Sequence, residues 1–346
     1  MAERLCSKKA AVAAGEDRLS TLPEDVIHLV LSLLPSCQAV RTCVLATRWR
    51  TLWKSVPSLR VDADDEAYRC CQDLKRFIDS FLRCRGPTPL HECEILFDDD
   101  RRSEEFHQDF ELWLRYAVSH EVRVLRFEIL AGHDPLQLSA GALISEHLTT
   151  LILRCVEFED FSLDVSGCQS LEVLEMHECV INIGTALPKS LKHLTIRDTS
   201  FGSQDSPCLT SAPGLSGTTN LELTAEYFMI FRTDIEWCPM FSRLKTLLLS
   251  DWCMVQYFHG LVFFLKHSPI LERLTLEHCT LSKQWYDTTT ETYKPKDKFL
   301  VSKHLKAVEI NHVKGDKRIH LLLKVLAFHG VYSELINFKE KLQFPA

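Results

Sequence analysis

The chain has 346 residues, 46% of them hydrophobic and 25% charged, which is typical of a globular protein with about two or three domains. Its formal net charge of −7 argues against a nucleic-acid partner, because binding to phosphates requires clustered lysine and arginine. No apolar run approaches the roughly 18–20 residues that cross a bilayer, so we expect no membrane partner either.

Residues 1–15 are predicted to be disordered, and they lack the apolar core of a secretory signal. We therefore expect a cytoplasmic or nuclear location, where thiols stay reduced. The 14 cysteines include no pair with the spacing of zinc ligands. We expect them to act as small apolar residues, with no metal and no cofactor.

Residues 16–60 are predicted to form a domain of three short helices. Pro23 stands where a first helical position tolerates proline, and Glu24 and Asp25 follow where negative charge is favoured. A surface helix needs one apolar stripe, but this helix carries two. The stripes are Val26, Val30 and Leu33 beside Ile27, Leu31 and Leu34.

The first helix is expected to end at Pro35, after which Ser36 can cap a second helix. A third segment places Trp49, Leu52, Trp53 and Val56 at helical spacing. Three helices in about 40 residues are near the size below which a core rarely holds alone. The surplus apolar surface is therefore covered either by the rest of the chain or by a partner protein.

Several short motifs in this domain resemble the F-box of plant F-box/leucine-rich-repeat proteins. They are Asp17-Arg18-Leu19-Ser20, Leu22-Pro23, Leu33-Leu34-Pro35, Ala39-Val40, Arg48-Trp49-Arg50 and Leu52-Trp53. The resemblance implies a three-helix module that docks on a Skp-type adaptor and, through it, on a cullin–RING ubiquitin ligase. The contact or supporting residues that it implies are Leu22, Pro23, Leu34, Pro35, Val40, Trp49, Leu52 and Trp53.

The chain departs from the F-box pattern at two places. Ser36-Cys37-Gln38 replaces the usual threonine-lysine run, and Ala46-Thr47 replaces a usual serine-lysine. Two positive charges are thereby absent, which leaves the choice of adaptor open.

Residues 61–89 are predicted to be a helical linker or cap. A helix over residues 66–85 is expected to end at Gly86-Pro87. Its apolar face consists of Leu74, Phe77, Ile78, Phe81 and Leu82. Such a helix would cover the first member of a repeat array, which needs a cap for solubility.

Residues 90–300 repeat a pattern of the type L-x-x-L-x-L at intervals that mostly suit leucine-rich repeats. The copies begin at residues 90, 122, 148, 171, 191, 218, 244 and 271, and another begins at 305. Strands of an unrelated sandwich are the alternative, but the intervals are too long for hairpins. The predicted fold is therefore α/β, an N-terminal three-helix F-box followed by an irregular leucine-rich-repeat solenoid with parallel strands.

Two kinds of position in the repeats indicate specific roles. Cys179 and Cys279 stand where the repeat consensus satisfies backbone groups at the turn. Alternate strand residues are expected to point outward, and their mixed charge suits a protein ligand. These candidate substrate-binding residues are Arg126, Glu128, Arg154, Glu175, His177, His193, Arg197, Arg273 and Glu277.

Residues 301–346 are predicted to contain the last repeat and a partial element that resembles the FBD of the same plant family. This resemblance covers residues 305–330, whereas the tail beyond Val331 departs from the family's usual strand. A shortened or altered end is therefore expected.

The sequence contains no Gly-rich phosphate loop, GxSxG or HExxH motif, so we expect no catalysis by this chain. The resemblance implies the substrate-recognition subunit of an SCF-type cullin–RING ubiquitin ligase, whose repeats bind an unknown protein substrate. One alternative is a ligase-independent scaffold or decoy that binds the adaptor without a degradation substrate. Another is a receptor in which a small hormone joins a substrate to the repeats.

Overall fold

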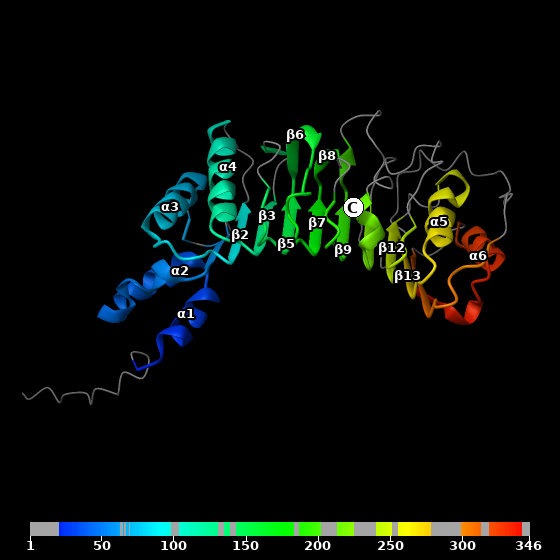
Figure 1. Cartoon of the computed structure of the whole chain (residues 1–346), viewed down its shortest axis with the longest axis horizontal. Helices are drawn as coiled ribbons and strands as arrows, with labels where there is room; N and C mark the ends of the chain where they lie inside the picture. Colours follow the sequence, from blue (N-terminus) through cyan, green and yellow to red (C-terminus); the bar gives the residue numbers. More distant parts are fainter. Residues whose placement is uncertain are drawn as a thin grey trace, which may run out of the picture.

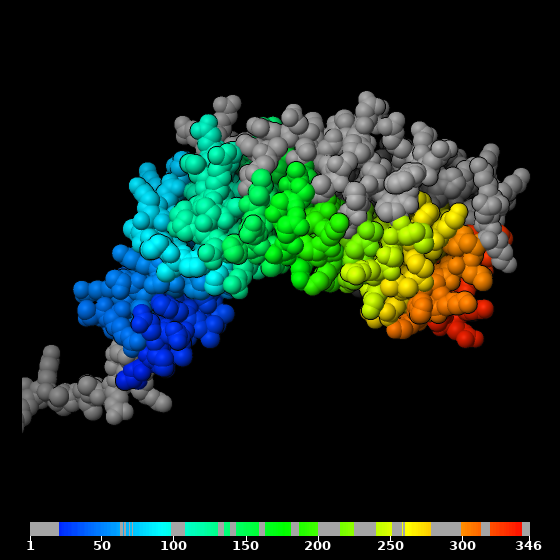
Figure 2. Space-filling view, viewed as in Figure 1, coloured from blue at the N-terminus to red at the C-terminus, as the bar shows by residue number. Residues whose placement is uncertain are grey.

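The computed structural model describes residues 21–62, 65, 67–68, 70–97, 104–130, 135–138, 143–182, 187–201, 213–224, 240–250, 255–277, 299–312 and 318–340. Residues 1–15, which the sequence predicts to be disordered, lie outside this part of the chain. A small helical module is followed by one long sheet with helices near both ends (Figure 1). Together they form a shallow arch, with the module at one end and the last repeats at the other (Figure 2).

The N-terminal module contains two α-helices, α1 (Glu24–Ser32) and α2 (Ser36–Arg41). The predicted third helix is replaced by short 3-10 turns, η1 (Thr42–Val44), η2 (Thr47–Arg50) and η3 (Leu52–Ser55). Trp49 of η2 and Leu52 of η3 nevertheless both belong to the core of the module. Apolar spacing alone therefore did not distinguish the two kinds of helix in this short segment.

Two prolines set the starts of α1 and α2. Pro23 and Pro35 each precede the first helical residue, with φ angles of −56° and −53°. Pro23 therefore stands one residue before the predicted position. Ser36 does not cap α2, because its hydroxyl accepts a hydrogen bond from the Arg60 amide at 2.9 Å instead.

The central sheet has 11 parallel strands in the order β1-β2-β3-β5-β7-β9-β11-β12-β13-β14-β15. Each of the nine predicted repeats supplies one strand, which confirms the repeat assignment. These strands are β2 (Glu92–Phe97), β3 (Val124–Ile129), β5 (Thr150–Arg154), β7 (Val173–His177), β9 (His193–Arg197), β11 (Asn220–Thr224), β12 (Thr246–Ser250), β13 (Arg273–Glu277) and β14 (Ala307–His312). Equivalent leucines pair in register, for example Leu151 with Leu174 and Leu174 with Leu194.

Two strands at the ends of this sheet were not predicted. β1 (Ser58–Asp62) pairs with β2, and its Leu59 and Val61 are buried as in the other repeats. Helix α3 (Cys71–Cys84) joins β1 to β2, so it is the return helix of a first repeat as well as the cover of that end. β15 (Ile336–Glu340) pairs with β14, so the tail beyond Val331 forms a strand despite its departure from the family pattern.

The remaining elements return the chain between the strands. The helices are α4 (Glu104–Ser119), α5 (Val255–His267) and α6 (Arg318–Phe328), with 3-10 turns η5 (Pro213–Gly217) and η8 (Ser333–Leu335). A second parallel sheet has the order β10-β8-β6-β4, with strands Ser200–Phe201, Val180–Asn182, Val156–Ser162 and Leu136–Leu138. None of the described helices is long and apolar enough to span a membrane.

One continuous apolar core runs through the repeats from Leu59 to Val331. It joins the inward side chains of the central sheet to α3, α4, α5 and α6, as in the ring contact of Phe110 with Phe127 at 4.4 Å. Strand side chains alternate between the two sides of a sheet. The opposite side of the central sheet, called the open face below, therefore carries the half-buried and exposed residues of each strand.

Candidate functional site

Helix α1 divides its two apolar stripes between a core and solvent. Ile27 and Leu31 are fully buried in a small core that also contains Trp49. The other stripe is exposed, with Leu29 and Leu33 at 61% and 65% of their possible surface. We call this stripe the outer apolar face; it consists of Val26, Leu29, Val30 and Leu33. Contiguous exposed apolar side chains of this kind mark protein-binding surfaces.

A second exposed apolar pair lies after α2. Val44 ends η1, Leu45 follows it directly, and both side chains are mostly exposed. The sequence indicates Val44 and Leu45 as part of the apolar side of the second helix, but neither they nor Leu29 were among the predicted adaptor-binding residues. The only signal was the surplus of apolar residues. That surplus does not say which stripe faces the core.

The predicted adaptor-binding residues divide into three groups. Trp49 and Leu52 belong to the module core, where Leu22 and Leu34 pack against them. Val40 and Trp53 pack against the core of the repeats. Pro23 is exposed and Pro35 is half-buried. Most of the set therefore supports the module from inside.

The module continues into the repeats without a linker, because only residues 56 and 57 separate η3 from β1. The Ser58 hydroxyl donates a hydrogen bond to the Ser32 carbonyl at 3.1 Å. The Cys37 thiol donates one to the Asp65 carboxylate at 2.9 Å. Burial is the main reason that the pKa of the Cys37 thiol rises to about 11. The two parts are thus joined by direct contacts on several sides.

Aromatic side chains cover the same junction. Trp53 of η3 lies 5.4 Å from Phe81 of α3, measured between ring centres. Phe81 lies 5.8 Å from Phe77, which lies 5.5 Å from Tyr68. This row of rings connects the end of the module to the first return helix. The Trp53 side chain is therefore part of the internal packing at the junction.

All nine predicted substrate-binding residues lie on the open face. Each is half-buried or exposed, whereas its strand neighbours are buried. In the register of the sheet, Arg154 of β5, His177 of β7 and Arg197 of β9 lie side by side. The prediction that these side chains point away from the core is confirmed.

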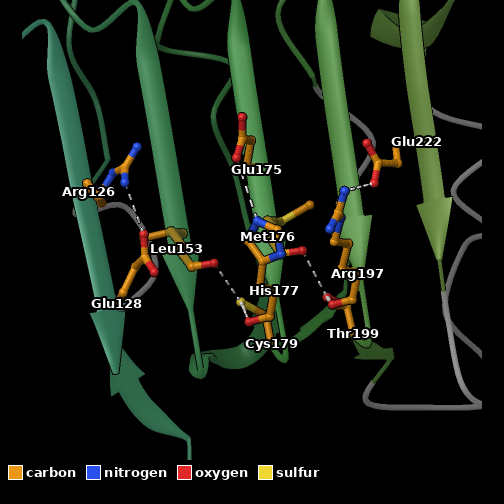
Figure 3. A network of polar contacts seen from close by, with 10 residues as sticks. All are labelled: Arg126, Glu128, Leu153, Glu175, Met176, His177, Cys179, Arg197, Thr199 and Glu222. Carbon is orange, nitrogen blue, oxygen red and sulfur yellow. Dashed lines mark hydrogen bonds and ion pairs between the residues drawn. The ribbon is translucent and has the colours of Figure 1, made fainter. Parts of the chain in front are cut away.

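Most charged groups in the middle of the open face form ion pairs (Figure 3). Arg126 contacts Glu128 at 3.5 Å, and His177 contacts Glu175 at 3.6 Å. Arg197 pairs with Glu222 of the next strand. The hydrogen bond from His177 is the main cause that holds the pKa of Glu175 below its usual range. The middle of the open face therefore presents both charge signs, mostly as existing ion pairs.

Hydrogen bonds at the strand ends fix the turns below this face. The Cys179 thiol contacts the Leu153 carbonyl at 3.6 Å and the His177 carbonyl at 3.2 Å. Thr199 contacts the carbonyls of Met176 and Arg197 in the same way, at 3.4 and 2.9 Å (Figure 3). The predicted turn role of Cys179 is confirmed. Cys279 lies outside the described residues.

The cysteines that the structure describes differ in their exposure. Several are buried in the core as expected, and burial raises the pKa of the Cys93 thiol to about 12. Cys70 and Cys84 differ from the expectation, because both are exposed near the ends of α3. In the described part of the chain, no group of three or more histidine, cysteine, aspartate or glutamate residues could hold a metal ion.

The structure combines a helical module that has an exposed apolar helix face with a long parallel sheet of leucine-containing strands, and this architecture fits a leucine-rich-repeat fold. The family model described as the F-box domain matches residues 19–60. An F-box/FBD/LRR-repeat protein of Arabidopsis thaliana is 27% identical over 336 residues, which cover 83% of this chain and 76% of the relative. By these findings, residues 19–60 match the F-box domain, and the chain as a whole is similar to plant F-box/leucine-rich-repeat proteins.

Two further relatives from Arabidopsis thaliana have the same kind of name. One F-box/FBD/LRR-repeat protein is 30% identical over 60% of this chain and 42% of its own length. Another is 24% identical over 82% of this chain and 70% of its own length. The chain thus spans less than half of the first of these two relatives, and the similarity supports the architecture more directly than it supports any one activity.

Proposed function

We propose that this chain is the substrate-recognition subunit of an SCF-type cullin–RING ubiquitin ligase. The match to the F-box domain over residues 19–60 supports binding to a Skp-type adaptor in general. The outer apolar face is the single observation that carries the proposal to particular side chains. Covering one leucine or valine side chain completely contributes about 1.5–3 kcal/mol, so four partly exposed ones favour a stable complex.

The residues at the centre of the proposed adaptor contact are not the same as those predicted from the sequence. Its centre is the outer apolar face, with Pro23 at the start of the same helix. Val40, Trp49 and Trp53 are assigned supporting roles, because their packing holds α1 and the junction in place. Leu52 has the same role inside the module core.

The proposed client-binding surface is the open face of the repeats. The nine predicted residues supply its polar pattern, and typically fewer than about a third of contact residues carry most of the binding energy. The proposed contribution to catalysis is proximity. A bound client would stay near a ubiquitin-charged enzyme at a raised effective concentration, and no residue of this chain is assigned to the chemical step.

The proposal is tested by co-expressing the full chain with a Skp-type adaptor and measuring whether a stoichiometric complex elutes. Leu33→Glu changes the outer apolar face and is expected to abolish the complex. Leu112→Glu on α4 is the matched control, because Leu112 is 63% exposed and receives the same substitution. Loss in both variants, or no complex from the folded wild-type chain, would argue against adaptor docking on α1.

A ligase-independent scaffold or decoy is the alternative, suggested by the departures at Ser36-Cys37-Gln38. Ser36 and Cys37 form internal contacts with Arg60 and Asp65, so their substitution has a structural reason at the junction. Recovery of cullin with the chain, together with a client that accumulates when the chain is removed, distinguishes the ligase subunit from the scaffold.

A further inference from the structure

The turns that precede strands β9 to β14 carry a concentration of positive charge. The same backbone hydrogen bond recurs in them, for example from Leu191 to Pro188 and from Leu305 to Ser302, both at 3.2 Å. Exposed cations stand in the turns or at the strand starts of β9, β12, β13 and β14, whereas the turn before β11 contains none. They are Lys189, Lys192, Arg243, Lys245, Arg273, Lys303 and Lys306, and we call them the basic rim.

Carboxylates balance only part of the basic rim. Lys245 and Lys306 both contact Glu272, at 3.7 and 2.5 Å. Lys192 contacts Glu172 at 2.6 Å. The other cations form no ion pair among the residues that the structure describes; they are Lys189, Arg243, Arg273 and Lys303. The excess of positive charge is notable because the whole chain has a net charge of −7.

The dimensions of the basic rim suit a short extended peptide. Neighbouring strands lie about 4.8 Å apart, so the four intervals from β9 to β14 span roughly 19 Å. An extended segment of about six residues has that length at about 3.3 Å per residue. The cations are exposed side chains on four of the five turns or strand starts along this edge, which favours several weak contacts along a segment over one deep binding pocket.

The basic rim lies on the same edge of the sheet as the N-terminal module. All strands of the central sheet are parallel, so their first residues share one edge. Ser58 begins β1 and contacts Ser32 of α1, which places the module at that edge. A segment bound to the rim would therefore lie on the side of the sheet that the module occupies.

We propose that the basic rim binds a glutamate- and aspartate-rich segment of a protein partner. A long nucleic acid fits less well, because it would extend past the rim onto a chain that is acidic overall. The identification of this partner with the ligase client rests on the proposed function. The binding of an acidic segment does not depend on it.

The test measures fluorescence anisotropy of a labelled glutamate-rich peptide of about ten residues, titrated with the purified full chain. A peptide with glutamine in place of every glutamate is the neutral probe. We expect the acidic peptide to bind with an affinity that falls as salt increases, and the neutral one not to bind. Absence of binding by the acidic peptide at low salt overturns the proposal.

Two double variants separate the basic rim from total charge. Arg243→Glu with Lys303→Glu is expected to weaken binding at least about tenfold, which corresponds to about 1.4 kcal/mol. Arg83→Glu with Lys324→Glu makes the same change of charge at exposed positions on α3 and α6 and is expected to have little effect. Equal loss in both variants, or tighter binding of a single-stranded RNA oligonucleotide than of the peptide, contradicts the proposal.

Adaptor binding is measured on the same proteins to keep the two proposals distinct. Both double variants are expected to retain the adaptor, because neither changes the outer apolar face. If the chain binds the acidic peptide but no adaptor, the basic-rim proposal holds and the ligase proposal is contradicted. If the chain binds the adaptor but not the peptide, the adaptor proposal holds and the basic-rim proposal is contradicted.

Discussion

Arg85 offers a direct test of how the module is joined to the repeats. Only 8% of this residue is exposed, and it lies at the end of α3. Its guanidinium donates hydrogen bonds to the carbonyls of Val56 and Pro89, the latter at 3.2 Å, and lies 5.8 Å from the ring centre of Phe81. Arg85→Met keeps much of the aliphatic volume but removes these donors. Val56 precedes β1 and Pro89 precedes β2, so the change loosens both strand starts.

The expected cost follows from the groups left behind. The buried Val56 carbonyl costs about 1–3 kcal/mol when it loses its donor, and the Pro89 carbonyl, whose hydrogen bond is only partly buried, costs less. The gain from no longer burying the guanidinium, whose pKa burial already lowers, offsets part of this cost. We expect a net loss of about 3 kcal/mol in the local stability of the junction, the low end of the range for breaking a buried charged contact. That loss raises the equilibrium constant for local opening of the junction roughly 100-fold.

Native-state hydrogen exchange measures this effect strand by strand. We expect faster exchange of amides in β1 and at the end of α3, and no change in β12 to β14, because each repeat contacts only its neighbours. Arg76→Met is the control, since the Arg76 side chain on the same helix is 78% exposed. Unchanged exchange in β1 would refute the role of Arg85, and a uniform increase along the sheet would refute the locality of the junction.

Three other predictions concern the cores and the open face. Leu31→Ala removes a fully buried side chain from the small module core and is expected to cost about 2–5 kcal/mol in urea denaturation; a cost below about 1 kcal/mol would argue against that core. His177→Ala is expected to raise the pKa of Glu175 toward the ordinary 4.5 in an NMR titration. The folded-state pKa of Glu175 lies below that value, so the stability from the pair is present above pH 4.5 and is lost as the pH falls through the lowered pKa; an unchanged pKa in the variant would exclude His177 as the main cause. A maleimide at pH 7 is expected to label the exposed Cys84 and spare Cys93, and comparable labelling rates would contradict the burial of Cys93.

The repeats could be predicted because each strand follows a local rule. Inward leucines at fixed spacing recur through the chain, and their alternation places residues such as Arg126 and Glu175 on the open face. β1 was not predicted because Leu59 and Val61 come directly after a segment, ending at Val56, that helical spacing already explained. β15 was missed because Ser333 stands where the pattern has a leucine, so only Ile336 and Phe338 remain of the three apolar positions.

The outer apolar face, the proposed docking surface, was harder to predict for a physical reason. Composition showed that α1 has more apolar surface than one helix face needs, but the direction of each stripe depends on how α1 packs against η3. The resemblance then selected positions that are typical of the family, without separating contact from support. Trp49 and Leu52 are needed to build the module, whereas Leu29 faces solvent and was not among the predicted adaptor-binding residues. Spacing likewise could not show that Ser36 joins β1 rather than capping α2.

The alternation of side chains in the central sheet has a consequence for how specificity changes during evolution. Each strand presents at most about three residues on the open face, and none of these belongs to the apolar core. A substitution such as one at Arg273 or Glu277 therefore changes the surface that this face presents, and with it the proposed recognition of a client, while the leucines that hold the strand remain in place. A lineage with this scaffold is able to acquire a new binding preference one strand at a time, and folding places little constraint on the order of those steps.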